Sequence, residues 1–422
     1  MRNKVLAVAL AAGMSITSLA LASDPAGFDT TSCVYPANSP LPGSGAVRAV
    51  PSQYTTIQAA VNAAVEGDTI EISPGTYNES TNVTTPGLRI RGTDRNAVIL
   101  NGGNVREVGF EITADRVVVE NLTAHNYKLH AVHWTGVTGY WGRYLTAYNN
   151  GLYGLFAFGS RCGQMDHSYT SGNADSGFYI GQCFPCDAVI HNVEAIGNAI
   201  GYSGTNAGGN LTLRDSVWND NALGIVPNSL DSEARPPQRG LTIKNNEIRH
   251  NNALDAPGQG IAALFYGGGI VIAGGQGNVV AGNTVTDNAL GGVVLAPLPD
   301  QSVYIPSGNT VWGNTVTHDE GLYPDAFDLG QAASSGPNNC WADNTFGNSS
   351  PPAIQDIWSC AFTLTPPGGS PTVEVALVSG FAGLNGRSPS PWQDWPYVGP
   401  HQTQTTDLTG AVDSWLPALG LS

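Results

Sequence analysis

The sequence predicts an all-β protein built as a parallel β-solenoid of roughly ten coils. Three observations lead to this prediction. Similar segments recur through the middle of the chain, apolar and polar residues alternate with a period of two inside them, and Asn and Gly stand at the corners. Because apolar residues at helical spacing are missing there, a helical or leucine-rich solenoid fits poorly.

The repeated unit recurs about every two dozen residues in its early copies. The units are ENLTAHNY (120–127), RYLTAYNN (143–150), DHSYTSGN (166–173), HNVEAIGN (191–198), RDSVWNDN (214–221), KNNEIRHN (244–251), AGNTVTDN (281–288) and WGNTVTHD (312–319). Equivalent residues of successive coils should stack in columns at the strand spacing of ~4.8 Å. An Asn at a repeated corner is expected because its amide can bond to the coils on either side.

The two ends of the solenoid differ in sequence. Residues 56–64 form the one clear amphipathic helix, which we expect to cap the open end of the coil stack before a first strand at 67–72. The solenoid should occupy residues 50–345. Residues 346–422 lose the repeat and are rich in Pro and Trp, so we expect an irregular tail. Its Trp392, Trp395 and Tyr397 should pack against the flank of the solenoid or its C-terminal opening, with sugar binding as the alternative.

The first residues point to export. Residues 1–22 have a basic start, an apolar run and an Ala-Leu-Ala ending, the pattern of a signal peptide cleaved near Ala22 and Ser23. Residues 23–49 would then be an N-terminal extension. No other stretch is apolar enough for membrane insertion. The net charge of −16 argues against nucleic acid as a partner. We therefore expect a secreted protein.

The stretch YTTIQAAVNAAVEGDTIEISPGTYNES (54–80) resembles the opening of the pectin-lyase-like right-handed parallel β-helix superfamily. The later units resemble its repeats, so the likeness covers roughly residues 50–345. It implies a right-handed β-helix and a polysaccharide or cell-surface glycan as partner. The superfamily includes lyases, hydrolases, esterases, epimerases and proteins without known catalysis, so the fold leaves the reaction open.

All six cysteines follow the predicted signal peptide, and export favours disulfides. Cys162 lies one coil before residues 185–187, so we expect it to pair with Cys186, or else with Cys183. Cys340 and Cys360 should close the C-terminal end. Cys33 would pair with whatever remains, or stay free.

Asp166 is the first candidate catalytic residue. It falls in an outward-facing column with Glu120, Arg143, His191, Arg214 and Lys244. One interpretation is a solvent-exposed salt ladder. The other is a catalytic site in which Asp166, beside His167, acts as base or cation ligand while Arg143 binds a carboxylate. Asp175 is the second candidate acid.

No metal or other cofactor is expected, with calcium kept as an alternative. Met165–Ser168 resembles a pectate lyase strand whose Asp belongs to a calcium-binding acid cluster, so Asp166 would be the ligand. The further acids that such a cluster needs are missing from the neighbouring coils. His125, His130 and His133 have a metal-like spacing, but no acid or cysteine joins them.

Outward-facing rings form a second set of candidates. His133, Phe156 and Tyr179 occupy like positions on three successive coils, and Tyr148 and His125 form another pair. Such a row could bind the C–H faces of sugars, or it could cover the flank of the solenoid.

Long inserts interrupt the later coils. Residues 227–240 and 296–309 should emerge from one edge of the solenoid, and residues 253–268 should leave from another corner. Lengthened turns on a rigid scaffold are where clefts are built. The inserts add six candidates of second rank: Asp231, Glu233, Arg235, Arg239, Asp300 and Tyr304.

Two functions fit these features. The first is a polysaccharide-binding enzyme, lyase-like and acting on a uronic-acid-containing glycan, with a glycoside hydrolase as the other enzyme type. The second is a non-catalytic structural or glycan-binding protein outside the cell. The sequence leaves the oligomeric state open.

Overall fold

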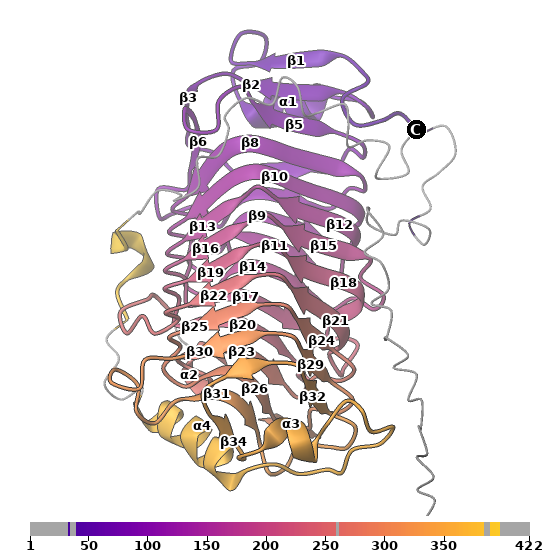
Figure 1. Cartoon of the computed structure of the whole chain (residues 1–422). Coiled ribbons are helices and arrows are strands. Elements are labelled where there is room, and N and C mark those ends of the chain that lie inside the picture. The colour runs from indigo at the N-terminus through magenta and orange to yellow at the C-terminus, as the bar shows by residue number, and fades with distance from the viewer. Residues whose placement is uncertain (1–32, 34–38, 259–260, 384–388, 397–422) are drawn as a thin grey trace, which may run out of the picture.

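The computed structural model describes residue 33 and residues 39–258, 261–383 and 389–396. These residues form a right-handed parallel β-helix whose coils stack along one axis (Figure 1). The predicted fold class is therefore confirmed. The predicted signal peptide and Tyr397 lie outside the described residues.

Each coil contributes one strand to an eleven-stranded parallel sheet, here called sheet B. Its strands, from the N-terminal end, are β4 (Thr81–Val83), β7 (Val108–Ile112), β9 (His130–Thr135), β11 (Leu155–Phe158), β14 (Ser176–Gly181), β17 (Ile200–Thr205), β20 (Leu223–Asn228), β23 (Gly268–Ala273), β26 (Gly291–Ala296), β31 (Phe327–Gln331) and β34 (Ser349–Ser350).

The rest of each coil belongs to sheet A, which bends at a corner into two arms. The first arm contains β1 (Val47–Val50), β2 (Thr69–Ile72), β5 (Arg89–Gly92), β8 (Val117–His125), β10 (Thr138–Tyr148), β12 (Arg161–Asp166), β15 (Ala188–His191), β18 (Gly208–Arg214), β21 (Arg239–Lys244), β24 (Val279–Ala281), β29 (Thr310–Trp312) and β32 (Cys340–Ala342). The second arm contains the later halves of β8 and β10 with β3 (Gly75–Tyr77), β6 (Val98–Asn101), β13 (Tyr169–Ser171), β16 (Glu194–Ile196), β19 (Val217–Asn219), β22 (Glu247–Arg249), β25 (Thr284–Thr286), β30 (Thr315–Thr317) and β33 (Thr345–Phe346).

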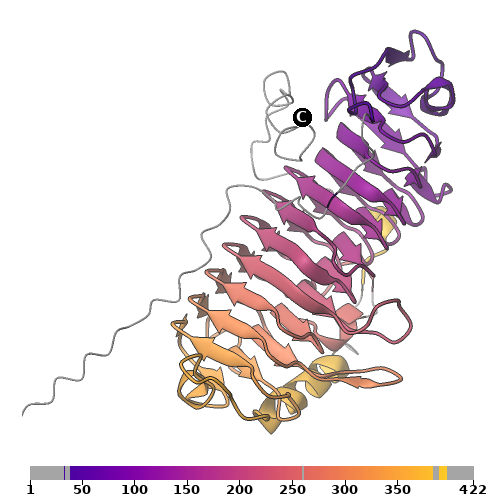
Figure 2. The same ribbon diagram turned by 90° about the vertical axis from the view of Figure 1, so that its right-hand side faces the viewer.

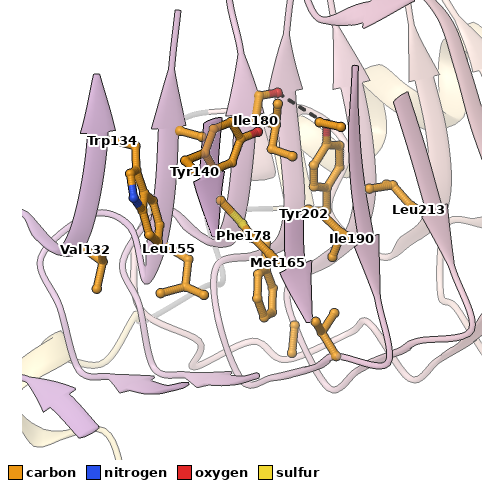
Figure 3. Close-up of a cluster of buried hydrophobic side chains, with 14 of the residues drawn as sticks. Val132, Trp134, Tyr140, Leu155, Met165, Phe178, Ile180, Ile190, Tyr202 and Leu213 are labelled. Carbon is orange, nitrogen blue, oxygen red and sulfur yellow. Dashed lines mark hydrogen bonds between the residues drawn. The ribbon is translucent and has the colours of Figure 1, made fainter. Parts of the chain in front are cut away.

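The register follows the repeat. Leu122 pairs with Leu145 and Ala124 with Ala147, so like residues stack on neighbouring coils. The core is formed by the inward-facing side chains of both sheets, among them Trp134, Tyr140 and Tyr202 (Figure 3). The Tyr202 hydroxyl donates to the Ile180 carbonyl at 3.3 Å, which satisfies a buried polar group.

The corners are joined by asparagine ladders, as predicted. At the turn that leads into sheet B, each amide oxygen accepts from the backbone N–H of the preceding coil along Asn150, Asn173, Asn198, Asn221, Asn251 and Asn288. Further ladders run through Asn246, Asn283, Asn314 and Asn344, and through Asn278, Asn309 and Asn339. Buried backbone donors at the turns are thereby paired.

The predicted capping helix is confirmed. Helix α1 (Ile57–Ala63) begins after Thr56, whose side chain accepts from the Ala59 amide. Ile57, Ala60 and Val61 are buried against the first coils. The cap covers core side chains at the open end of the solenoid.

The tail is less irregular than expected. Helix α3 (Ile354–Ile357) closes the C-terminal end, with Ile354 fully buried in the core. Helix α4 (Pro371–Gly383) packs with the short α2 (Ile261–Leu264) on the later strands of sheet B (Figure 1). Its Gly and β-branched residues are weak helix formers, which hid this helix in the sequence.

Trp395 packs against the flank of the solenoid, as predicted. Its ring lies so close to Gly172 and Gly197 that a Cβ atom at either glycine would be 2.5 or 2.8 Å from it. The Asn149 amide also donates to the Trp395 carbonyl at 2.9 Å. A second extension of the chain, the hairpin of β27 (Leu298–Pro299) and β28 (Val303–Tyr304), projects from the coils in Figure 2.

The disulfides correct one prediction and confirm another. Cys340 pairs with Cys360, as expected, but Cys162 pairs with Cys33, and Cys183 with Cys186. Cys162 does lie beside Cys186, since its amide donates to the Cys186 carbonyl at 2.9 Å. The predicted pairing depended on the offset of one coil, and that offset brings Cys162 and Cys186 together without joining their sulfur atoms.

No helix among the described residues is long and apolar enough to cross a membrane.

Candidate functional site

The outer face of sheet B carries the predicted row of rings. His133, Phe156 and Tyr179 occupy equivalent positions on β9, β11 and β14, and Glu111 on β7 precedes them. Ring centroids are 4.5 Å apart for His133 and Phe156, and 4.9 Å apart for Phe156 and Tyr179. His133 Nδ1 lies 2.9 Å from the Glu111 carboxylate. The column is confirmed.

Two rings that the sequence did not single out widen this row. Tyr153 lies parallel to Phe156 with centroids 4.3 Å apart, and His130 lies 4.6 Å from Phe156. We call His130, His133, Tyr153, Phe156 and Tyr179 the aromatic strip. Burial by its neighbours and the charge of His133 lower the pKa of His130 to about 3, so that ring is neutral.

The strip is more covered than an open sugar platform would be. Phe156 is 7% exposed and Tyr179 only 2%, whereas Tyr153 and His133 are partly exposed. A ligand can therefore contact Tyr153 and His133, with Phe156 as their support. Tyr179, one of the four residues predicted to bind sugar, instead contacts another part of the protein through its hydroxyl.

Tyr179 holds down part of the first insert, residues 229–238, here called the strap. Its hydroxyl donates to Glu233 Oε2 at 2.9 Å, and Gln182 Nε2 donates to the same oxygen at 3.0 Å. The Ala234 amide donates to Gln182 Oε1. Asn206 bonds to the backbone of Leu230 and Glu233. The strap thus lies across β14 and β17.

The two inserts meet, as their shared edge predicted. The Tyr304 hydroxyl, on the hairpin, donates to Asp231 Oδ1 at 2.5 Å, and the Asp231 amide donates to Asp300 Oδ2 at 2.7 Å. The bond from Tyr304 is the main reason why the pKa of Asp231 is lowered. These three residues hold the strap in place against the hairpin.

Asp175 stands at the turn before β14, beside the aromatic strip. Its position is fixed by backbone bonds between coils, since the Leu152 amide donates to the Leu129 carbonyl and the Asp175 amide to the Leu152 carbonyl. The Ser176 hydroxyl donates to Asp175 Oδ1 at 2.8 Å, and the Tyr153 hydroxyl also bonds to this carboxyl. Burial, reinforced by the charge of Glu233, raises the pKa of Asp175 to about 6.

Asp166 lies elsewhere, on the outer face of the first arm. Its predicted column is confirmed through Glu120, Arg143, His191, Arg214 and Lys244. A solvent-exposed ladder, however, is wrong for the central members, because Glu120 and Asp166 are 0% exposed and Arg143 is 6% exposed. Arg95 lies at the corner next to this face, where it donates to Thr146 Oγ1 and to the carbonyls of Leu145 and His167.

The carboxylate of Asp166 is surrounded by donors. It accepts from Arg143 Nε at 2.9 Å and Gln164 Nε2 at 2.6 Å, and His167 Nδ1 lies at 2.7 Å. Burial alone would raise its pKa, but the His167 bond and the Arg143 charge outweigh it and hold the pKa at about 2. This cationic setting disfavours calcium there.

The predicted catalytic set does not converge on one face. Asp166, Arg143 and His167 lie on or beside the first arm. Tyr148 lies on the second arm, stacked on His125 with ring centroids 4.5 Å apart. Asp175, His133, Phe156 and Tyr179 lie together at sheet B. The candidate residues therefore form two separate groups and a lone pair, because the coil turns two corners between these positions.

One group of potential metal ligands occurs among the described residues, formed by Cys33, Cys162 and Asp187 within 4.8 Å of one another. The two cysteines are joined in a disulfide, so their sulfurs are not available as thiolate ligands.

Comparison with known proteins concerns the fold. No family model matches the sequence, and neither does any curated protein. Among solved structures, the chain is similar to the A-module of mannuronan C-5 epimerase AlgE6 from Azotobacter vinelandii, with 17% identity and a TM-score of 0.48 over 69% of this chain and 92% of that one. An alginate lyase from Paenibacillus sp. str. FPU-7 has 14% identity and a TM-score of 0.43 over 72% and 97% of the two chains. The tailspike protein mutant D339N of E. coli bacteriophage HK620, solved with a pentasaccharide, has 12% identity and a TM-score of 0.48 over 67% and 55%.

Proposed function

We propose that this is an exported protein that binds a polysaccharide on the outer face of sheet B and cleaves its glycosidic bonds by proton transfer at Asp175. The observation that carries the proposal is the state of Asp175. It is a partly exposed carboxyl with a pKa of about 6, held by Tyr153 and Ser176 beside the aromatic strip.

Glycosidic cleavage needs a group that gives a proton to the departing oxygen. A carboxyl with a pKa near 6 is still partly protonated where an ordinary Asp has lost its proton, and it is a stronger acid than water by many orders of magnitude. Burial and the charge of Glu233 keep the proton on Asp175. Glu233 supplies a second carboxylate on the same face, as acid–base cleavage of glycosides commonly requires.

Sugar binding follows from the same face. Tyr153 and His133 present partly exposed rings, backed by Phe156. The C–H faces of sugar rings pack on such surfaces, and the polar edges of Tyr and His can bond to hydroxyls. The finer prediction, a lyase-like enzyme for a uronic-acid-containing glycan, belongs to this proposal, and its products distinguish elimination from hydrolysis.

The test is release of reducing ends from a panel of uronic and neutral polysaccharides by the wild-type protein and the Asp175→Asn variant. We expect cleavage of at least one polymer and a fall of about 10²–10⁴-fold in the variant. Asp220→Asn is the matched control, because Asp220 is exposed on another corner with a left-handed backbone that Asn accepts.

Equal cleavage by Asp175→Asn would refute the assignment of Asp175. If the protein bound polysaccharides of the panel but cleaved none, the alternative, a non-catalytic glycan-binding protein, would be correct. An unsaturated sugar at the new chain end would identify elimination, and its absence would identify hydrolysis.

A further inference from the structure

A cavity of about 250 Å³ lies where the strands of sheet B end and the chain turns toward the first arm. It spans three coils, with Gly136 after β9, Gly159 after β11 and Gln182 after β14. Arg161 lines it from β12 and Arg235 from the strap. The cavity therefore joins the edge of sheet B to the strap that covers Tyr179.

Two glycines keep the floor of this cavity open. Gly136 and Gly159 have left-handed backbones (φ 67° and 59°), and a Cβ atom at either position would meet nothing within 4 Å. On the next two coils the equivalent corner residues are Gln182 and Asn206, and their amides hold the strap. The corner thus has no side chain on the first two coils, and amide side chains close it on the two that follow.

The cavity is lined by two guanidinium groups that have weak partners. Arg161 Nε donates to Thr138 Oγ1 at 3.4 Å, and Arg235 Nη1 donates to the Phe184 carbonyl at 3.4 Å. Both residues are exposed, and among the described residues neither forms an ion pair. Arg239 adds a third cation nearby, stacked 3.7 Å above the Phe184 ring.

This concentration of positive charge is unusual in a chain with a net charge of −16. An arginine pair presents forked donors that match a carboxylate. At about 250 Å³ the cavity is smaller than the pockets of roughly 300–1,000 Å³ that enclose drug-sized ligands, so it suits one sugar unit of a longer chain. Gln182 lines the cavity and also bonds to Glu233, which connects it to the proposed cleavage site.

We propose that this cavity is a carboxylate subsite in which Arg161 and Arg235 bind the acidic group of one uronic acid unit. The inference rests on the proposed function, and it assigns the choice between acidic and neutral glycans to these two residues. The subsite lies at the far end of β14 from Asp175, so it would select the polymer through a unit several sugars from the bond that breaks.

The test compares binding of an oligogalacturonate with binding of the same oligomer after its carboxyl groups are reduced to alcohols. Both are measured by calorimetry at low salt on the Asp175→Asn protein, to avoid turnover. We expect the acidic oligomer to bind at least about tenfold tighter, because charge-assisted bonds to two arginines are lost with the carboxylate. Adding Arg161→Gln and Arg235→Gln should abolish that preference.

Arg214→Gln with Arg249→Gln is the matched control, since it removes two positive charges from other faces of the solenoid. The preference should survive this change. Equal binding of the two oligomers, no binding of either, or a preference that persists without Arg161 and Arg235 would each refute the subsite. Cleavage by Asp175→Asn would instead refute the proposed function, while the oligomer comparison would still decide the subsite.

Discussion

Asp166 and Asp175 belong to one coil and have opposite environments. Asp166 lies on the first arm with Arg143, His167 and Gln164 bonded to its carboxylate, and its pKa is held at about 2. Asp175 lies at the edge of sheet B with hydroxyl donors from Ser176 and Tyr153 and the carboxylate of Glu233 nearby, and its pKa rises to about 6. Burial raises the pKa of both carboxyls, so the opposite outcome comes from their neighbours.

The comparison separates two uses of a polar column on a β-helix. Where a cation stands between acids at the rung spacing, as Arg143 does between Glu120 and Asp166, the charges partly neutralise one another and the column stabilises the coils. Where an acid faces another acid and uncharged rings, its proton is retained and becomes available for chemistry. Stacking alone therefore does not mark a site. The neighbours of the acid distinguish the two columns: a cation beside Asp166, and a carboxylate and rings beside Asp175.

The largest expected effect is on stability, from Asp166→Asn. This change leaves the buried guanidinium of Arg143 without the carboxylate that it contacts at 2.9 Å, so we expect a loss of about 3–5 kcal/mol in the free energy of unfolding. Urea unfolding at neutral pH measures it. Cleavage by the protein that remains folded should be nearly unchanged, in contrast to Asp175→Asn.

Asp215→Asn is the control for that measurement, because its pair with Arg214 is partly exposed and should contribute less than about 1 kcal/mol. If Asp166→Asn were as mild as this control, the column would not be a stabilising network. If it abolished cleavage without loss of stability, the catalytic role first predicted for Asp166 would be restored.

The columns of the solenoid could be predicted from the sequence because the parallel register fixes them. Once the repeat places Asp166 beneath Arg143, or Phe156 between His133 and Tyr179, each coil can only repeat the alignment of the last. The same argument locates the asparagine ladders and the shared edge of the two inserts. These features depend on spacing along the chain.

What covers a column could not be predicted in this way. Arg95 comes from an earlier turn to bond to the carbonyl of His167, next to Asp166 in the chain, and the strap reaches Tyr179 from a later coil. Cys33 bonds to Cys162 across 129 residues. Such contacts depend on the paths of turns outside the repeat. For the same reason the sequence named Asp175 as a candidate acid but gave no sign that Tyr153 and Glu233 would affect its pKa.

The second effect is on the pH dependence of cleavage. Because the proposed proton donor is Asp175 with a pKa of about 6, kcat/KM should fall about tenfold for each pH unit above that value. Glu233→Gln removes the proposed second carboxylate, so kcat/KM should be lower at every pH. It also removes a charge that helps to hold the proton on Asp175, so the fall of the remaining activity should move to lower pH. A fall that stays in place in this variant would mean that another group titrates.

The two aspartates also change the free energy of unfolding with pH in opposite directions. Folded Asp175 keeps its proton after the unfolded chain has lost it, so it reduces stability as pH rises from about 4 to about 6. Folded Asp166 loses its proton first, so its stabilisation disappears as pH falls from about 4 to about 2. Asp175→Asn should remove the pH dependence between about 4 and about 6. Asp166→Asn should remove the pH dependence between about 2 and about 4. Urea unfolding across these ranges measures both.

The smallest effect concerns the strap, through Tyr179→Phe. The change removes the hydroxyl that donates to Glu233 at 2.9 Å but keeps the ring against Phe156. Gln182 still bonds to Glu233, so the strap should loosen by only about 1 kcal/mol. Amide hydrogen exchange of residues 229–238 should then become about fivefold faster.

Tyr202→Phe is the matched control, because it removes a hydroxyl from the next coil that points into the core and bonds to Ile180. It should leave exchange in the strap unchanged. Since Glu233 raises the pKa of Asp175, a looser strap should also lower that pKa, and the pH at which cleavage falls should decrease in Tyr179→Phe. Faster exchange with an unmoved pH profile would show that the strap covers the site without tuning it.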